Sequence, residues 1–265
     1  MYSRSQLIKR YIYHRFSASN GKGHGIHSPF VFDFVKNVLR DRKKYEHYTI
    51  IETARQKLLK QTAEIEVEDL GAGSSVIKTT KRKVSDIAAS SLKPAKYAQL
   101  LYRIVKYYQP KTILELGTSF AVTASYLAAA DPNARLFTIE GCPAIGDIAR
   151  KTFQRVGVEN IELIEGDFDN VLPPLLTKLD NIDLAFIDGN HRKEPTLNYF
   201  QQLLQHSNAS TILIFDDIHW SREMEEAWAE IQHAPQVTLT IDLFFIGLVF
   251  VNPDFKKKQD FKIRF

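Results

Sequence analysis

The hydrophobic pattern of the chain changes character near residue 90. Beyond it, an amphipathic helix is predicted over residues 93–108, and Pro110 should end it. Short apolar or β-branched runs then alternate with helical patterns, forming five strand-helix units in a row. None of these strands shows strict apolar-polar alternation, which is typical of a parallel sheet covered on both faces. The pattern therefore predicts a doubly wound α/β fold.

Seven strands are expected in this mostly parallel sheet. They cover residues 112–116, 135–140, 161–166, 182–188, 211–217, 237–243 and 246–251. Only Phe244 and Phe245 separate the last two strands, which is too short a connection for a helical crossover. The last strand should therefore be antiparallel to its neighbours.

Residues 1–90 are predicted to form a mainly helical N-terminal extension, and residues 91–265 the sheet domain. Helical patterns cover residues 28–40 and 48–60, while residues 17–28 are rich in Gly, Ser and His and indicate a loop. The extension is expected to close over the open end of the sheet, where ligands of such folds bind.

Composition narrows the class of protein. Hydrophobic residues make up 44% and charged residues 25%, as in soluble globular proteins. The longest apolar run, residues 243–251, is far shorter than the ~20 residues of a membrane-spanning helix, and no signal peptide is evident. The lone Cys142 excludes an internal disulfide. We expect a cytoplasmic protein with no membrane partner.

Charge does not indicate a nucleic-acid partner. The net charge of +4 is concentrated in basic runs at residues 40–44, 81–83 and 256–258. Such runs are usually solvated surface, and no aromatic-basic motif accompanies them. A small molecule is the expected partner, and the sequence leaves the oligomeric state open, a homodimer included.

Two glycine-containing turns compete as a nucleotide-binding site. Residues 68–75, "EDLGAGSS", have more glycines, but no helix of useful length follows before residue 83. Residues 113–128 join a buried strand to a helix, whose N-terminal amides would face a ligand. Context favours this second turn, and the first is interpreted as a surface turn or a lid segment.

Five ordered motifs then resemble a known family. They are "ELGTSFAVTASYLA", "FTIEG", "EGDFDNVLP", "DLAFIDGNH" and "ILIFDDIHW", from Glu115 to Trp220. They are similar to the strand-end motifs of class I S-adenosylmethionine-dependent methyltransferases, which have a Rossmann-like fold, and especially of the small-molecule O-methyltransferases of catechol and caffeoyl-CoA type. The resemblance covers about residues 90 to 252.

The resemblance implies a set of cofactor-binding residues. Glu140 stands 140 − 117 = 23 positions after Gly117, where an acid accepts hydrogen bonds from ribose hydroxyls. The whole set for S-adenosylmethionine is Glu115, Gly117, Thr118, Ser119, Glu140, Gly141, Asp167, Phe168 and Asp188, with Ser91 and its neighbour Ser90 as weaker members. The family's usual second glycine is replaced by Ala121, whose methyl group could crowd the cofactor.

The resemblance also implies a metal site and a base. Asp188, Asp216 and Asp217 match metal ligands of the metal-dependent members, where the third position is usually Asn. Carboxylates at neighbouring strand ends suit Mg²⁺ or Ca²⁺. His191 stands where those members carry the base, and Asp188 shares the catalytic role. The alternatives are that Asp217 caps the next helix, that His191 is a plain loop residue, and that His219 only packs over the sheet end.

The expected activity is transfer of a methyl group from S-adenosylmethionine to an oxygen of a small molecule, assisted by a divalent cation. One rival is an RNA or protein methyltransferase, although residues 187–191, "IDGNH", lack the Asn-Pro-Pro-Tyr clamp of that class. The other is a non-catalytic module that kept the fold. A zinc site of His14, His24 and His27 is disfavoured because it lacks Cys and helical spacing.

Overall fold

The computed structural model describes residues 1–19, 21, 27–68 and 79–265 of the chain. They form two compact units, one made of Met1–Asp41 with Leu179–Phe265 and the other of Arg42–Lys178. The division predicted at residue 90 stays a prediction. The α/β class with mostly parallel strands is confirmed. Among the described residues, no helix combines the length and apolar character needed to cross a membrane.

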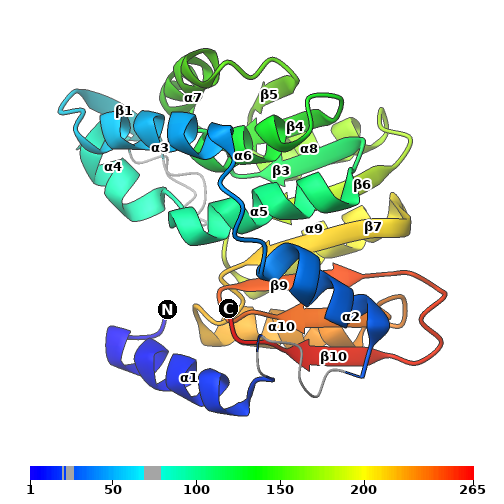
Figure 1. Cartoon of the computed structure of the whole chain (residues 1–265). Helices are drawn as coiled ribbons and strands as arrows, with labels where there is room; N and C mark the ends of the chain where they lie inside the picture. Colours follow the sequence, from blue (N-terminus) through cyan, green and yellow to red (C-terminus); the bar gives the residue numbers. More distant parts are fainter. Residues whose placement is uncertain (20, 22–26, 69–78) are drawn as a thin grey trace. The chain divides into compact units, whose positions relative to one another are not determined.

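The unit Arg42–Lys178 contains three parallel strands of the predicted sheet. These are β3 (Thr112–Leu116), β4 (Arg135–Glu140) and β5 (Ile161–Glu165), with β4 between the other two (Figure 1). The helices are α3 (Glu46–Leu59), α4 (Val84–Ser91), α5 (Ala95–Tyr108), α6 (Val122–Ala130), α7 (Pro143–Val156) and α8 (Phe168–Leu176). Helix α5 ends at Tyr108, just before Pro110 as predicted, and its C-cap Gln109 has a left-handed backbone.

The predicted helical extension also contains a pair of strands. β1 (Glu64–Glu68) and β2 (Thr79–Lys83) are antiparallel, with Glu64 opposite Lys83 and Glu66 opposite Lys81. Opposite charges at directly facing positions stabilise such a pair. The predicted lid segment, residues 68–75, lies outside the described residues from position 69 onward.

The unit Met1–Asp41 with Leu179–Phe265 contains the remaining predicted strands and one more. Its strands are β6 (Ile182–Ile187), β7 (Ser207–Asp216), β8 (Leu239–Asp242), β9 (Ile246–Phe250) and β10 (Gln259–Lys262), in the order β10-β8-β9-β7-β6. β6 and β7 are parallel, and β9 is antiparallel to both β7 and β8, which confirms the predicted reversal. The edge strand β10, parallel to β8, was not predicted.

Helices pack against these strands within the same unit. They are α1 (Arg4–Ser17), α2 (Pro29–Phe34), the π-helical turn Val35–Leu39, α9 (Lys193–Gln205) and α10 (Arg222–His233). Trp228 of α10 packs closely against β9 at Gly247. A Cβ atom added to Gly247 would lie only 2.6 Å from the Trp228 ring. Gly247 therefore fixes how near α10 approaches the sheet.

Candidate active site

The turn after β3 has the tight geometry that the sequence predicted for a cofactor loop. Gly117, Ser119 and Ala121 all have positive φ angles, of 102°, 49° and 64°. The amides of Gly117 and Thr118 both donate to the carbonyl oxygen of Ile139, at 3.1 Å. This pairing ties the turn to the end of β4, just before Glu140.

Glu140 lies against this turn. Its carboxylate accepts hydrogen bonds from the amide of Ser119 at 2.9 Å and from the amide of Cys142 at 3.0 Å. Burial raises the pKa of Glu140 above its ordinary value, while the amides of Cys142, Ser119 and Gly141 act in the opposite direction. The structure thus brings together Ser119, Glu140 and Gly141 of the predicted set.

Ser91 also reaches the turn. Its hydroxyl oxygen lies 3.0 Å from that of Ser119, and it donates to the carbonyl oxygen of Ile87 at 2.8 Å. Ser90 instead bonds to the carbonyl oxygen of Asp86. Of the two serines at the end of α4, Ser91 is therefore the one beside the predicted cofactor loop.

Glu115 and Thr118 belong to a buried hydrogen-bond chain behind the turn. Glu115 is wholly buried and accepts from the hydroxyl of Thr138 at 2.6 Å. The hydroxyl oxygens of Thr138 and Thr118 lie 2.6 Å apart. These buried side chains stabilise the conformation of the turn from the protein interior.

Asp167 and Phe168 stand at the start of α8. Asp167 caps this helix by accepting from the amide of Asp169 at 2.8 Å, and Phe168 is half-buried. The amide of Gly166 donates to the carbonyl oxygen of Glu140 at 2.9 Å. The ends of β4 and β5 thus place Glu140 and Asp167 on one edge of this unit.

Ala121, with a φ of 64°, is strained at a position where the methyltransferase motif that it resembles usually has glycine. A left-handed backbone costs an L-residue about 1–2 kcal/mol, whereas glycine adopts it freely but loses more entropy on folding. Because Ala121 and Ala124 are both fully buried, glycine at either position also loses a buried methyl group, so the strain should appear as Ala121→Gly being more stable than Ala124→Gly by about 1–2 kcal/mol in denaturant unfolding of the protein. Ala124→Gly, inside α6, is the matched control and should destabilise it. An equal loss of stability in the two variants would contradict the strain.

A second group of polar side chains lies in the other unit, at the ends of β6 and β7. Asp188, His191 and Asp216 each offer a ligand atom, and these atoms all lie within 4.8 Å of one another. His191 Nε2 is 3.6 Å from a carboxylate oxygen of Asp188, and Asp216 is only 3% exposed. The pairing of Ile187 with Phe215 brings the two strand ends side by side.

Asp217, the third predicted ligand, is not a member of this group. It adopts a left-handed backbone with φ of 53°, and its amide donates to the carbonyl oxygen of Phe245 at 2.7 Å. It does not cap α10 either, because Ser221 does so by accepting from the amide of Met224. The structure therefore groups the predicted base, His191, with two of the predicted ligands.

The sequence missed one buried polar network. Asp242, at the end of β8, is 1% exposed and lies 3.0 Å from both His14 Nε2 and His219 Nε2. His219 also stacks on Phe244, with ring centroids 5.0 Å apart. His14, considered above for zinc, is thus engaged with Asp242, and His24 lies outside the described residues.

Comparison with known proteins identifies a methyltransferase match in the middle of the chain. Residues 114–218 match the family model described as a methyltransferase domain. The predicted resemblance to methyltransferases is confirmed. The matched methyltransferase region contains the turn after β3, Glu140, Asp167 and the Asp188, His191 and Asp216 group, whereas Ser91 lies outside it.

Individual relatives are O-methyltransferases. Catechol O-methyltransferase of Mycobacterium tuberculosis is 29% identical over 126 residues, which are 47% of this chain and 56% of that protein. Human transmembrane O-methyltransferase is 33% identical over 123 residues, covering 44% of this chain and 41% of that protein. The chain thus spans about half the length of the curated relatives it matches.

A solved structure shares the fold over most of its length. An O-methyltransferase of Bacillus cereus in complex with S-adenosylhomocysteine aligns with a TM-score of 0.57 and 20% identity. The alignment covers 83% of this chain and 97% of that chain. At this identity the likeness establishes the fold, so the reaction has to be argued from the residues.

Proposed function

We propose that the protein transfers a methyl group from S-adenosylmethionine to an oxygen of a small-molecule acceptor, with help from a divalent cation. The observation that carries the proposal is the left-handed turn after β3, whose Ser119 amide meets the carboxylate of Glu140. In nucleotide-binding folds of this class, an acid at the end of the second strand, beside the turn after the first, accepts hydrogen bonds from a ribose. The methyltransferase match over residues 114–218 supports it.

In this proposal, the residues of the Arg42–Lys178 unit hold the cofactor. Glu140 would accept hydrogen bonds from the ribose, since each of its oxygens can accept more than one. Asp167 and Phe168 would meet the adenine, and the turn would carry the methionine part. Bound S-adenosylmethionine would supply a sulfonium methyl group for transfer to a nucleophilic oxygen.

The acidic group of the other unit would prepare the acceptor oxygen. The carboxylates of Asp188 and Asp216 offer ligand oxygens within 4.8 Å of each other, which is a suitable start for holding a divalent cation with open positions. Such a cation would lower the pKa of an acceptor hydroxyl. Asp188 and Asp216 would hold this cation. Asp217 would join them only if the backbone conformation of its turn changed.

His191 has two roles that exclude each other. As a base, its imidazole takes the proton of the acceptor hydroxyl, which requires a lone pair that is not engaged. As a ligand, it uses that lone pair for the cation. We assign it the role of base, with Asp188 at 3.6 Å orienting the ring. His191→Gln should then lower the methyl-transfer rate and leave Mn²⁺ affinity within about twofold, whereas loss of Mn²⁺ binding would make it a ligand.

The cofactor assignment is tested by Glu140→Gln. Replacing the carboxylate with an amide removes a charged acceptor, so affinity for S-adenosylmethionine should fall by roughly ten- to a hundredfold in calorimetry. Glu162→Gln, on the exposed face of β5, is the matched control and should bind like the wild type. Unchanged affinity of the Glu140 variant, or no binding by the wild type at millimolar cofactor, would refute the proposal.

A further inference from the structure

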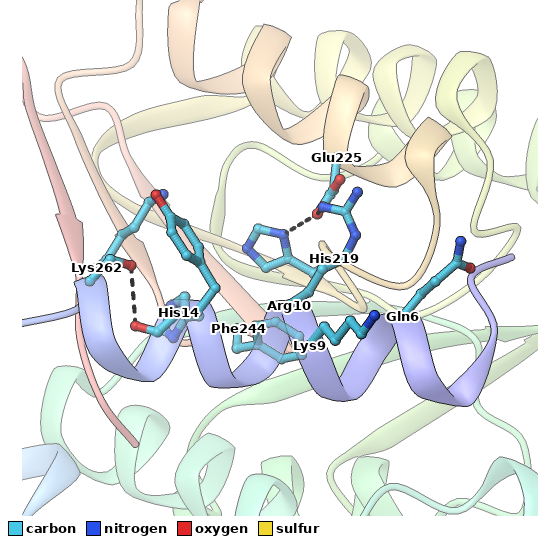
Figure 2. Close-up of a pocket in the computed structure, with 10 residues that line it drawn as sticks. Gln6, Lys9, Arg10, His14, His219, Glu225, Phe244 and Lys262 are labelled. Atoms are coloured by element: carbon cyan, nitrogen blue, oxygen red, sulfur yellow. Dashed lines mark hydrogen bonds and ion pairs between the residues drawn. The ribbon is translucent and has the colours of Figure 1, made fainter.

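A cavity of about 470 Å³ lies within the unit Met1–Asp41 with Leu179–Phe265. It is lined by α1 on one side and by residues at the ends of β8 and β10 on the other. Figure 2 shows Lys9, Arg10 and His14 on α1, with His219, Glu225, Phe244 and Lys262 around them. The lining also includes Gln6, Tyr13 and Ser17. None of these residues belongs to the proposed cofactor or cation sites. The volume is that of a small-molecule pocket.

The carboxylates at this cavity are already engaged by protein donors. Glu225 accepts from Arg10 at 2.7 Å and from the hydroxyl of Tyr2 at 2.8 Å, and its oxygen lies 3.0 Å from His219 Nδ1. Asp242, beneath the cavity, pairs with His14 and His219 and also accepts from the amide of Phe244 at 2.8 Å. Negative charge at the cavity is therefore compensated from within the protein.

The cations at the cavity exceed these carboxylates. Both ring nitrogens of His219 face carboxylates, which holds this residue in its charged form: burial alone would lower its pKa, but the hydrogen bonds to Asp242 and Glu225 raise it to about 9. With Lys9, Arg10 and Lys262, the cavity has four cations against Glu225 and the underlying Asp242. Among the described residues, the ammonium groups of Lys9 and Lys262 pair with no carboxylate.

The walls add an apolar component. Phe244 is 2% exposed and forms part of the lining, and the aliphatic stems of the lysines and the ring of Tyr13 extend it. A ligand that fits both features carries a negative group for the cations and an apolar or aromatic body for these walls. An inorganic ion alone would satisfy only the first.

We propose that this cavity is a binding site for a small organic anion, one with a carboxylate or phosphate group on an apolar body. Lys9 and Lys262 provide the attraction, and their aliphatic stems with the ring of Tyr13 provide the apolar contact, above the nearly buried Phe244. The buried network of His14, Asp242 and His219 fixes the cavity floor, because it ties α1 to the end of β8. This site stands independently of the proposed methyl transfer.

The test is calorimetry with phenyl phosphate, without S-adenosylmethionine. Saturable binding with a Kd of about 1 mM or tighter is expected, and benzyl alcohol, which lacks the charge, should bind at least roughly tenfold more weakly. The double variant Lys9→Gln/Lys262→Gln should weaken phenyl phosphate binding by roughly tenfold or more. The control Lys256→Gln/Lys257→Gln removes the same charge from exposed positions outside the lining and should not.

Three results would overturn the proposal. They are the absence of saturable binding by the wild type, equal binding of benzyl alcohol, and equal weakening in both double variants, which would indicate a general charge effect. A second readout places the ligand: binding should shift the ring NMR signals of His14 and His219. Heat without any such shift would put the ligand elsewhere. Neither readout requires methyl transfer, so failure of one proposal does not decide the other.

Discussion

Replacing Asp242 with asparagine is expected to destabilise the protein by about 3–5 kcal/mol, because it removes one partner from a buried charged network. Asp242 is 1% exposed and is the shared acceptor for His14 and His219. Asparagine has nearly the same shape but no charge, and its NH₂ group has to face one of the two imidazoles. Denaturant unfolding measures the loss, and circular dichroism checks that the variant folds.

The matched control is Asp254→Asn, an exposed carboxylate in the turn before β10. It should change stability by less than about 0.5 kcal/mol. An equal effect in both variants would show that the network contributes little.

The same network predicts how stability depends on pH. The pKa of His219 is raised from 6.5 to about 9, so its contribution is complete below pH 6.5 and is lost as pH rises towards 9. Although burial alone would raise the pKa of Asp242, the hydrogen bonds from His14 and His219 lower it below 3.8, so its contribution is lost only under strong acid. The wild type should lose stability between pH 6.5 and 9, and Asp242→Asn should flatten this dependence.

The strands could be predicted from the sequence where burial leaves a local pattern. β3, β4, β6 and the second half of β7 consist mostly of apolar or β-branched residues, because strands packed on both faces bury most of their side chains. β10 has no such pattern: it is a charged edge strand with alternating half-buried and exposed positions. It pairs with β8, whose residues stand about twenty positions earlier in the sequence, so the pairing depends on the tertiary fold and leaves no local pattern. The pairing of β1 with the basic strand β2 was not predicted either, because the glutamates of β1 interrupt its apolar pattern.

Candidate site residues could be named where motifs stand at strand ends. Glu140 was predicted because it ends a strand 23 positions after Gly117, and Ser119 because it matches the first motif of the family that the chain resembles; the structure joins the two, and their cofactor role stays a prediction. The grouping of His191 with Asp188 and Asp216 depends on the loop backbone, where Asn190 has a φ of 53°. The network of Asp242 was missed because His14 is 228 residues away in the sequence. The available signal was an acid inside the apolar segment of residues 239–250.

Asp216→Asn is expected to have the largest effect on the proposed reaction. Asp216 is 3% exposed and shares the proposed cation site with Asp188, so losing its charge would remove a ligand that solvent cannot replace. Mn²⁺ affinity, measured by electron paramagnetic resonance, should fall by roughly a hundredfold, and cation-dependent methyl transfer should fall with it.

Affinity for S-adenosylmethionine separates this role from a structural one. Apart from Ser91 and Asp188, the proposed cofactor residues lie on β3, β4 and β5 and the segments that follow them, whereas Asp216 ends β7, so calorimetry should give an affinity within about twofold of the wild type. Asp180→Asn, an exposed position before β6, is the control and should change neither property. If Asp216→Asn weakened Mn²⁺ and cofactor binding equally, the carboxylate would be supporting the fold. If Mn²⁺ affinity were unchanged, the reaction would have to rely on His191 as base without a cation.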